Sequence, residues 1–211
     1  AAVPFSICAR LRNGARRGDL LESLAISEEF ARLLDVQHAE LIRQYAYWYR
    51  IYACPNESDR QAIVQHIGTL AQTPLISLIL TLDSAAPDHL RALLESVSGQ
   101  LYPSWELCVA EQAIPGGMAH AILAEYVLRD PRIKRISGNW GGSAAMSLNA
   151  ALTQADGAYM AVLDEASVLS PHALYMIVEA LNRNPDACLI YSDEDKIDQD
   201  GRHVEPFFKP H

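Results

Sequence analysis

Residues Ala158–Pro171 read AYMAVLDEASVLSP. The apolar run ends in the acidic pair Asp164 and Glu165, and a Ser-Pro helix start follows at Ser170. This pattern predicts a buried strand that delivers a carboxylate to its C-terminal end. Open α/β sheets bind their ligands at that end of the strands. Asp164 is therefore the first candidate site residue.

Strand and helix patterns alternate around this stretch, from Leu75 towards the end of the chain. Predicted strands cover 75–82, 105–110, 132–136, 159–164 and 188–192, and predicted helices cover 87–98, 118–128, 143–154 and 171–182. Such alternation is typical of a parallel sheet with helices on both faces. We therefore predict a three-layer α/β/α fold with a mostly parallel sheet. The dipeptide Asp200-Gly201 predicts a hairpin turn near the C-terminal end of this fold.

The chain before Pro74 has a different, helical pattern. Apolar residues recur at helical spacing from Ser27, and a second helix follows Pro55-Asn56, with Ser58 or Asp59 as its N-cap. An aromatic cluster in the first helix would suit either sugar stacking or a packing face. Its members are Tyr45, Tyr47, Trp48, Tyr49 and Tyr52. We predict a helical N-terminal region, 1–73, followed by an α/β domain, 74–211.

The composition excludes several classes of function. The 211 residues carry a formal net charge of -9, so the chain lacks the basic surface that nucleic-acid binding needs. No apolar run approaches the roughly 18 residues of a membrane span, and no stretch resembles a signal peptide. The four cysteines lack metal-ligand spacing, which favours reduced thiols and a cytoplasmic protein.

Five sequence blocks carry a family resemblance through their order and spacing. They are PLISLIL from Pro74, QLYPSWEL from Gln100, GAYMAVLD from Gly157, YSDEDKID from Tyr191 and FFKP from Phe207. Together they resemble the family-2 glycosyltransferases of GT-A fold, and most of all the bacterial enzymes that build O-antigen and other surface polysaccharides. The resemblance implies a nucleotide-sugar donor, which is UDP-, GDP- or dTDP-linked, and an inverting transfer to a growing polysaccharide.

The resemblance also implies roles for particular residues. Thr81 and Asp83, at the end of the first strand, and Glu111, after the second, would contact the nucleotide base. Asp164 would face the ribose and a metal ion. The donor-sugar side of the cleft is expected to include Asn149, Asp193 and Asp195.

The metal motif departs from the family pattern. Family members carry Asp-x-Asp, whose second carboxylate ligates Mg²⁺ or Mn²⁺, because these hard cations prefer oxygen ligands. This chain reads Asp164-Glu165-Ala166, so alanine replaces the second aspartate. In strand register the side chain of Glu165 would point to the opposite face from that of Asp164. A divalent cation is expected here only if Asp164 alone can ligate it, or if the loop shifts so that Glu165 becomes the second ligand.

Two functions from different classes remain open. The first is a glycosyltransferase, or its donor-binding half, acting in the cytoplasm at the inner face of the membrane. The second is a catalytically inactive GT-A-like module that serves docking or assembly among other domains of a longer polypeptide. The resemblance places the general base beyond the block that starts at Phe207, so no catalytic residue is named and the domain is expected to be incomplete at its C-terminus. A nucleotide-cofactor oxidoreductase is disfavoured, because the first strand is not followed by G-x-G-x-x-G.

Overall fold

The computed structural model describes residues 45–47, 49, 54–83, 86–112, 117–207 and 209. The chain divides into two compact units, and the larger one is Cys54–Tyr191. The described residues of the smaller unit are 45–47, 49, 192–207 and 209. Most of the helix predicted from Ser27 lies outside the described residues. Within them, no helix is long and apolar enough to cross a membrane.

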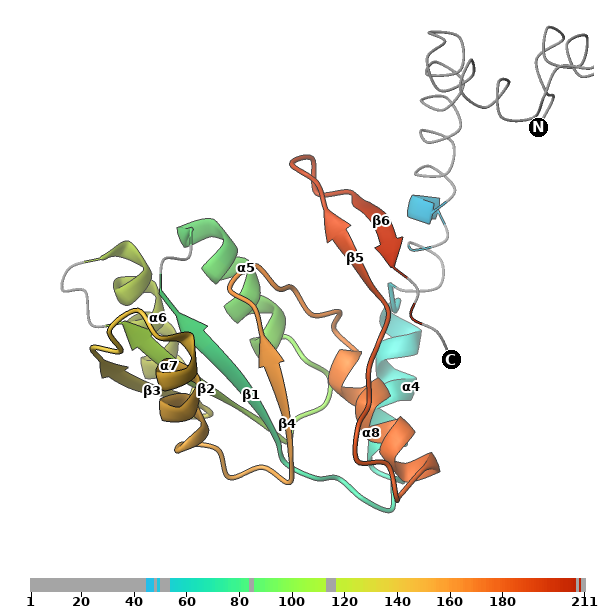
Figure 1. Ribbon diagram of the computed structural model, residues 1–211. Coiled ribbons are helices and arrows are strands. Elements are labelled where there is room, and N and C mark those ends of the chain that lie inside the picture. The colour runs from blue at the N-terminus through green and yellow to red at the C-terminus, as the bar shows by residue number, and fades with distance from the viewer. Residues whose placement is uncertain are drawn as a thin grey trace, which may run out of the picture. The chain divides into compact units, whose positions relative to one another are not determined.

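A four-stranded parallel sheet organises the larger unit (Figure 1). Its strands are β1 (Ile76–Leu82), β2 (Trp105–Gln112), β3 (Ile133–Gly138) and β4 (Tyr159–Leu163). They pair in the order β3-β2-β1-β4. The connecting helices are α5 (Pro87–Ser98), α6 (Met118–Arg129) and α7 (Ala144–Leu152), and α8 (Ala173–Arg183) follows β4. Each of these elements was expected from the sequence, with its ends displaced by at most two residues.

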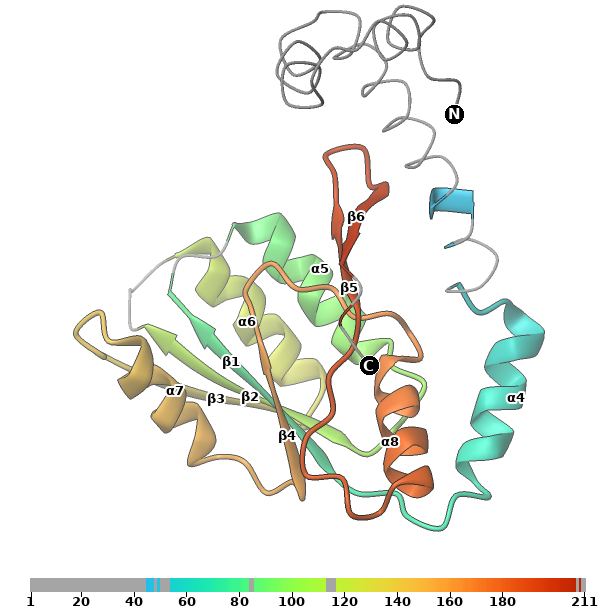
Figure 2. The ribbon, with the colours of Figure 1, turned by 45° about the vertical axis from the view of Figure 1, so that its right-hand side comes forward.

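The helices cover both faces of this sheet (Figures 1 and 2). Leu78 and Leu80 of β1 pack in a core with residues of α5, α6 and α8. Ile79, between them, belongs to a second core that includes Ala151 of α7. Successive side chains of a strand point to opposite faces, so a strand covered on both sides must be apolar throughout. The predicted three-layer α/β/α fold with a parallel sheet is confirmed.

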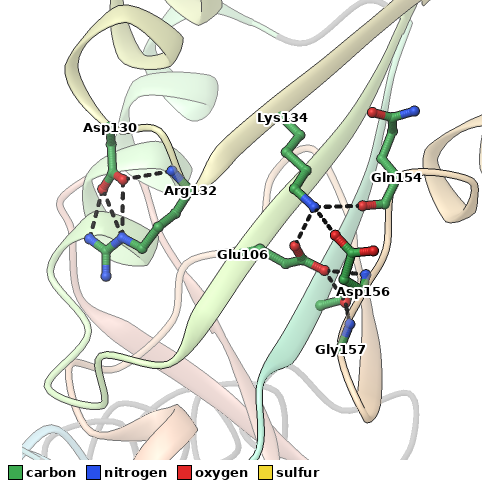
Figure 3. A network of polar contacts seen from close by, with 8 residues as sticks. Glu106, Asp130, Arg132, Lys134, Gln154, Asp156 and Gly157 are labelled. Atoms are coloured by element: carbon green, nitrogen blue, oxygen red, sulfur yellow. Dashed lines mark hydrogen bonds and ion pairs between the residues drawn. The ribbon is translucent and has the colours of Figure 1, made fainter.

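A buried charge network ties the amino ends of the strands together (Figure 3). Glu106 of β2 is 4% exposed. Its Oε1 accepts hydrogen bonds from Ser77 Oγ of β1 and from the backbone N–H of Asp156, each at 2.6 Å. Its Oε2 lies 2.7 Å from Lys134 Nζ of β3, which also contacts Asp156 Oδ2 at 2.6 Å. One carboxylate therefore links three strands and the turn that leads into β4.

Gly157 completes this network, and its surroundings explain why position 157 carries no side chain. Its N–H donates to Ser77 Oγ at 2.9 Å. A Cβ at this position would lie 2.5 Å from Ser77 Oγ and 2.7 Å from Ser77 N. Burial alone would raise the pKa of Glu106, but the hydrogen bonds from Lys134, Ser77 and Asp156 outweigh it and lower the pKa. Glu106 therefore stays ionised inside the protein.

The strand predicted at 188–192 is wrong. These residues form no strand, and Leu189 is 82% exposed. Their apolar pattern favoured a buried strand, but β4 is the edge of the described sheet and no described strand pairs with it on its outer side. The next strand is β5 (Glu194–Ile197), which pairs antiparallel with β6 (His203–Phe207). The expected turn at Asp200-Gly201 connects them, and Gly201 has a φ of +76°, which favours glycine.

Helix α4 (Glu57–Ile67) begins two residues earlier than an N-cap at Ser58 would place it, and three earlier than one at Asp59. Its N-cap is Asn56, whose Oδ1 accepts the N–H of Asp59 at 3.0 Å, while Asp59 Oδ2 accepts the N–H of Asn56 at 3.0 Å. This reciprocal pair satisfies two backbone donors at once and so outcompetes a cap at Ser58 or Asp59. None of the residues of α4 is buried.

Lys134→Met should destabilise the larger unit by about 3 kcal/mol, because it leaves the Glu106 carboxylate buried without its cation. We take the low end of the usual range since the Lys134 side chain is 30% exposed. Urea unfolding followed by circular dichroism measures the change. The matched control is Arg183→Met, which removes the ion pair of an exposed arginine with Glu179 and should cost about 0.5 kcal/mol. Equal effects of the two substitutions would contradict a central role for the network.

Candidate functional site

Asp164 lies at the carboxyl edge of the sheet, directly after β4, and is exposed. The short loop that follows it is closed by its own hydrogen bonds. Asp164 Oδ1 accepts the N–H of Ala166 at 2.9 Å, and the N–H of Asp164 donates to Ser167 Oγ at 3.1 Å. The loop therefore holds the Asp164 carboxylate in a defined position at the open end of the strand.

Glu165 connects this loop to the end of the neighbouring strand. Strands β1 and β4 pair with Leu80 opposite Leu163, so the residues that follow them are neighbours. Glu165 Oε1 accepts the backbone N–H of Asp83 at 2.5 Å. The structure thus brings Asp83 and the Asp164 loop together, as expected for two parts of one edge site. Glu165 is the residue that joins them, a role that the sequence pattern did not indicate.

Glu111 is 3% exposed and is surrounded by partners from the same unit. Its Oε1 lies 3.0 Å from His120 Nδ1 on α6. Its Oε2 accepts Ser137 Oγ at 3.1 Å and lies 3.7 Å from a guanidinium nitrogen of Arg135. A carboxylate with these contacts would meet a ligand only by exchanging a partner. His120, whose side chain is 43% exposed, is the accessible member of the group.

Thr81 and Glu111 face opposite sides of the sheet. Glu111 alternates with Val109 and so lies on the face covered by α5 and α6, where Val109 packs. Thr81 alternates with Ile79 and so lies on the α7 face, where Ile79 packs. The two residues end adjacent strands, but their side chains do not converge on one side of the sheet.

Gln112, the last residue of β2, is a candidate that the sequence pattern did not single out. It lies on the same face as Thr81 by strand alternation. Its Oε1 accepts the N–H of Trp140 at 3.3 Å, and its Nε2 lies 3.4 Å from Asn139 Oδ1. A carboxamide both donates and accepts hydrogen bonds, as contact with a nucleobase edge requires. A single amide side chain at a strand end is common, so the sequence alone gave no reason to select Gln112.

Asn149 lies away from these groups. It is exposed on α7, whose buried residues are Ser147 and Ala151. Those residues face the sheet, so Asn149 faces solvent along the middle of the helix rather than at its end beside the strand ends. Its assignment to the donor-sugar side stays a prediction.

Asp193 and Asp195 belong to the smaller unit, where both contact residues of that unit. Asp195 Oδ2 accepts Tyr45 Oη at 2.8 Å and lies 2.8 Å from His203 Nδ1. Tyr49 stacks on the His203 ring with centroids 3.6 Å apart. Asp193 Oδ1 accepts the N–H of Lys209 at 2.9 Å. Tyr45 and Tyr49 of the aromatic cluster thus take part in packing, and Trp48 and Tyr52 lie outside the described residues.

The residues at the Asp164 loop do not fit the expected metal ion. Ala166 supplies no ligand, and the Glu165 carboxylate is directed to Asp83. Across the part of the chain that the structure describes, no three His, Cys, Asp or Glu side chains are grouped so as to hold a metal ion. Asp164 is the one motif carboxylate left on the loop, and it already accepts the Ala166 N–H.

A parallel α/β sheet with polar groups at its carboxyl edge is the architecture of enzymes that bind nucleotides at the strand ends. Comparison with known families identifies the group more closely. The model of the family described as "Glycosyl transferase family 2" matches residues 78–209, which is more than half of the chain. The chain therefore belongs to glycosyl transferase family 2, and the resemblance found in its sequence is confirmed.

Two relatives resemble it well, but both are much longer proteins. One is the uncharacterized protein y4gI of Sinorhizobium fredii, 35% identical over 156 residues, which are 72% of this chain and 17% of the relative. The other is the O-antigen biosynthesis protein RfbC of Myxococcus xanthus, 32% identical over 163 residues, which are 77% of this chain and 13% of that protein. The chain spans less than a fifth of either relative.

Solved structures show a partial likeness. The S. aureus TarS structure in complex with UDP is 20% identical and covers 53% of this chain and 33% of its own, with a TM-score of 0.47. The mannosyltransferase PcManGT of Pyrobaculum calidifontis, in complex with GDP-Man and Mn²⁺, is 17% identical and covers 77% of this chain and 43% of its own, with a TM-score of 0.45.

Asp195→Ala should lower the pKa of Tyr45 towards the ordinary tyrosine value of 10.0. Burial raises the pKa of Tyr45 most, and the hydrogen bond to Asp195 and the negative charge of that carboxylate raise it further. Tyrosine ¹³C NMR during an alkaline titration measures the change. Asp193→Ala is the matched control, since Asp193 makes the smallest contribution to the shift. An unchanged Tyr45 titration in Asp195→Ala would contradict the contact.

Proposed function

We propose that this chain is the donor-binding half of a glycosyltransferase that transfers a sugar from a nucleotide sugar to a growing bacterial surface polysaccharide. The observation that carries the proposal is the exposed Asp164 carboxylate at the carboxyl end of β4, in a chain of glycosyl transferase family 2. The similarity to an O-antigen biosynthesis protein supports the polysaccharide context. The resemblance further supports a cytoplasmic location at the inner face of the membrane.

In this proposal, different residues at the carboxyl edge contact different parts of the nucleotide. Asp164 accepts hydrogen bonds from the ribose hydroxyls, since a carboxylate has only acceptor sites. Thr81, the penultimate residue of β1, and Asp83, which follows that strand, lie beside the base. Glu111 acts from the buried side by holding His120 through Nδ1, which directs the accessible imidazole edge outward.

We propose an inverting transfer, on the strength of the family resemblance. The acceptor hydroxyl attacks the anomeric carbon of the donor sugar and forms the new glycosidic bond. The bond from that carbon to the diphosphate oxygen breaks on the opposite face, and the nucleoside diphosphate leaves. The hydroxyl proton passes to a general base, which must lie within hydrogen-bond reach of the acceptor. None of the residues considered above is assigned that role.

The relatives are several times longer than this chain. We therefore propose that other domains of a longer polypeptide cooperate with it. In enzymes that carry Asp-x-Asp, a divalent cation neutralises the leaving diphosphate. The residues at Asp164 do not fit that ion, so no step is assigned to it here.

A second candidate function is a catalytically inactive module that acts in docking or assembly within a larger protein. Ala166 favours it, because the second metal-ligand position of the family motif is lost. The internal partners of Glu111 favour it as well, since a base-reading carboxylate would be expected to face a ligand. This candidate requires no nucleotide binding, which makes the two functions separable by one titration.

Isothermal titration calorimetry with UDP, GDP and dTDP tests the proposed function. We expect micromolar binding of one of them, weakened at least about tenfold in Asp164→Ala, because the ribose loses a charged hydrogen-bond acceptor. Each titration is run with Mn²⁺ and with EDTA, so that the outcome does not depend on the metal.

Two controls separate contact from folding. Asp164→Asn keeps an oxygen that can accept the Ala166 N–H, so it preserves the loop while removing the charge. Asp186→Ala changes an exposed carboxylate in the turn after α8 and should leave binding unchanged. If none of the three nucleotides binds to the wild-type chain, donor binding is refuted and the docking module is favoured.

A further inference from the structure

The contacts of the Glu165 carboxylate determine whether it is available to bind a divalent cation beside Asp164. Glu165 is adjacent to Asp164 in the sequence and is hydrogen-bonded to the backbone of Asp83 across the β1–β4 pair, and both of these aspartates are exposed. Its Oε1 accepts the Asp83 N–H, so the negative charge of Glu165 is turned towards the end of β1. A backbone N–H bonded to a carboxylate is one of the stronger hydrogen bonds in a protein.

Asp164 is also engaged within its own loop. Its Oδ1 accepts the Ala166 N–H at 2.9 Å, and the N–H of Ser167 returns to the Asp164 carbonyl at 3.0 Å. These contacts form a closed turn in which residue 166 contributes only its backbone. In an Asp-x-Asp loop, the side chain at that place would be the second oxygen ligand.

We propose that Glu165 is a positioning residue that fastens the β4 loop to the end of β1, and that this edge binds its nucleotide without a divalent cation. The proposal rests on the proposed function for its nucleotide part, but its metal part concerns the free protein alone. The Glu165 carboxylate belongs to the β4 loop and holds that loop to the end of β1 through the backbone N–H of Asp83.

Direct metal binding tests whether this edge of the free protein holds a divalent cation. Electron paramagnetic resonance of Mn²⁺ titrated with the wild-type protein should show no binding that Asp164→Ala removes. Ala166→Asp restores the two-residue spacing of the motif and should tighten Mn²⁺ binding at least about tenfold, because a second carboxylate is added to the site. Val168→Asp adds the same charge nearby without that spacing and should not. Wild-type binding that depends on Asp164, or an Ala166→Asp variant without a gain, would overturn the proposal.

Amide hydrogen exchange of Asp83 tests the positioning role. Glu165→Ala should speed exchange of this amide at least about tenfold, because its charged acceptor is lost. Glu165→Gln keeps an acceptor oxygen and should retain most of the protection. Equal exchange in all three proteins would overturn the contact.

The nucleotide titration then tests whether the positioning role of Glu165 and metal-independent nucleotide binding go together. UDP, or whichever nucleotide binds, should bind equally in Mn²⁺ and in EDTA to the wild type and more weakly to Glu165→Ala. Binding that requires Mn²⁺ would overturn this proposal while leaving the proposed function intact. Failure of every nucleotide to bind would refute the proposed function, and the Mn²⁺ and exchange measurements would still decide the role of Glu165.

Discussion

The ion pair between Glu106 and Lys134 is the constraint on which the rest of the larger unit depends. A charge buried in a protein interior is costly unless its partners are in place, so the pair tolerates little displacement. Through Ser77 and the turn at Asp156 and Gly157, the same carboxylate fixes β1 and β4 relative to β2 and β3. Register set at the amino ends determines where each strand finishes. The alignment of the groups at the carboxyl edge therefore begins at the opposite end of the sheet.

At the carboxyl edge the carboxylates differ in what they contact. Glu111 is buried among His120, Ser137 and Arg135, and Glu165 bonds the backbone at Asp83. Asp164 is exposed and bonds only within its own loop among the contacts described here. These differences separate two structural acids from one that faces solvent.

Local pattern was enough to predict the elements of the larger unit. Apolar runs identify the strands, and residues such as Pro87 and Ser143 mark where helices begin. Because these signals lie within each segment, β1 to β4 and α5 to α8 were predicted. The strand expected at 188–192 failed for a different reason. A strand forms only when another strand pairs with it, and the sequence of the segment alone does not show whether such a strand is present.

The site was predicted less completely, because its contacts join residues distant in the chain. Asp164 and Asp83 were placed correctly at the ends of their strands, whereas the pairing of β1 with β4 that makes them neighbours was not predicted. The bond from Asp83 to Glu165 spans 82 positions, and no periodicity encodes it. The same holds for Glu111, whose burial depends on the path of α6 and the position of His120. Strand alternation could have shown that Thr81 and Glu111 face opposite sides, had their pairing been known.

The most direct test of a nucleotide site at this edge is a ¹⁵N chemical-shift titration of the protein with UDP, GDP or dTDP. Backbone amides at both ends of the same sheet report at once, so the amino-end network supplies an internal control. We expect the largest shifts at Asp83 and at Asp164 to Ser167, with the amides of Asp156 and Gly157 unchanged. Shifts centred on the amino end, or spread evenly over both ends, would contradict a donor site at the carboxyl edge.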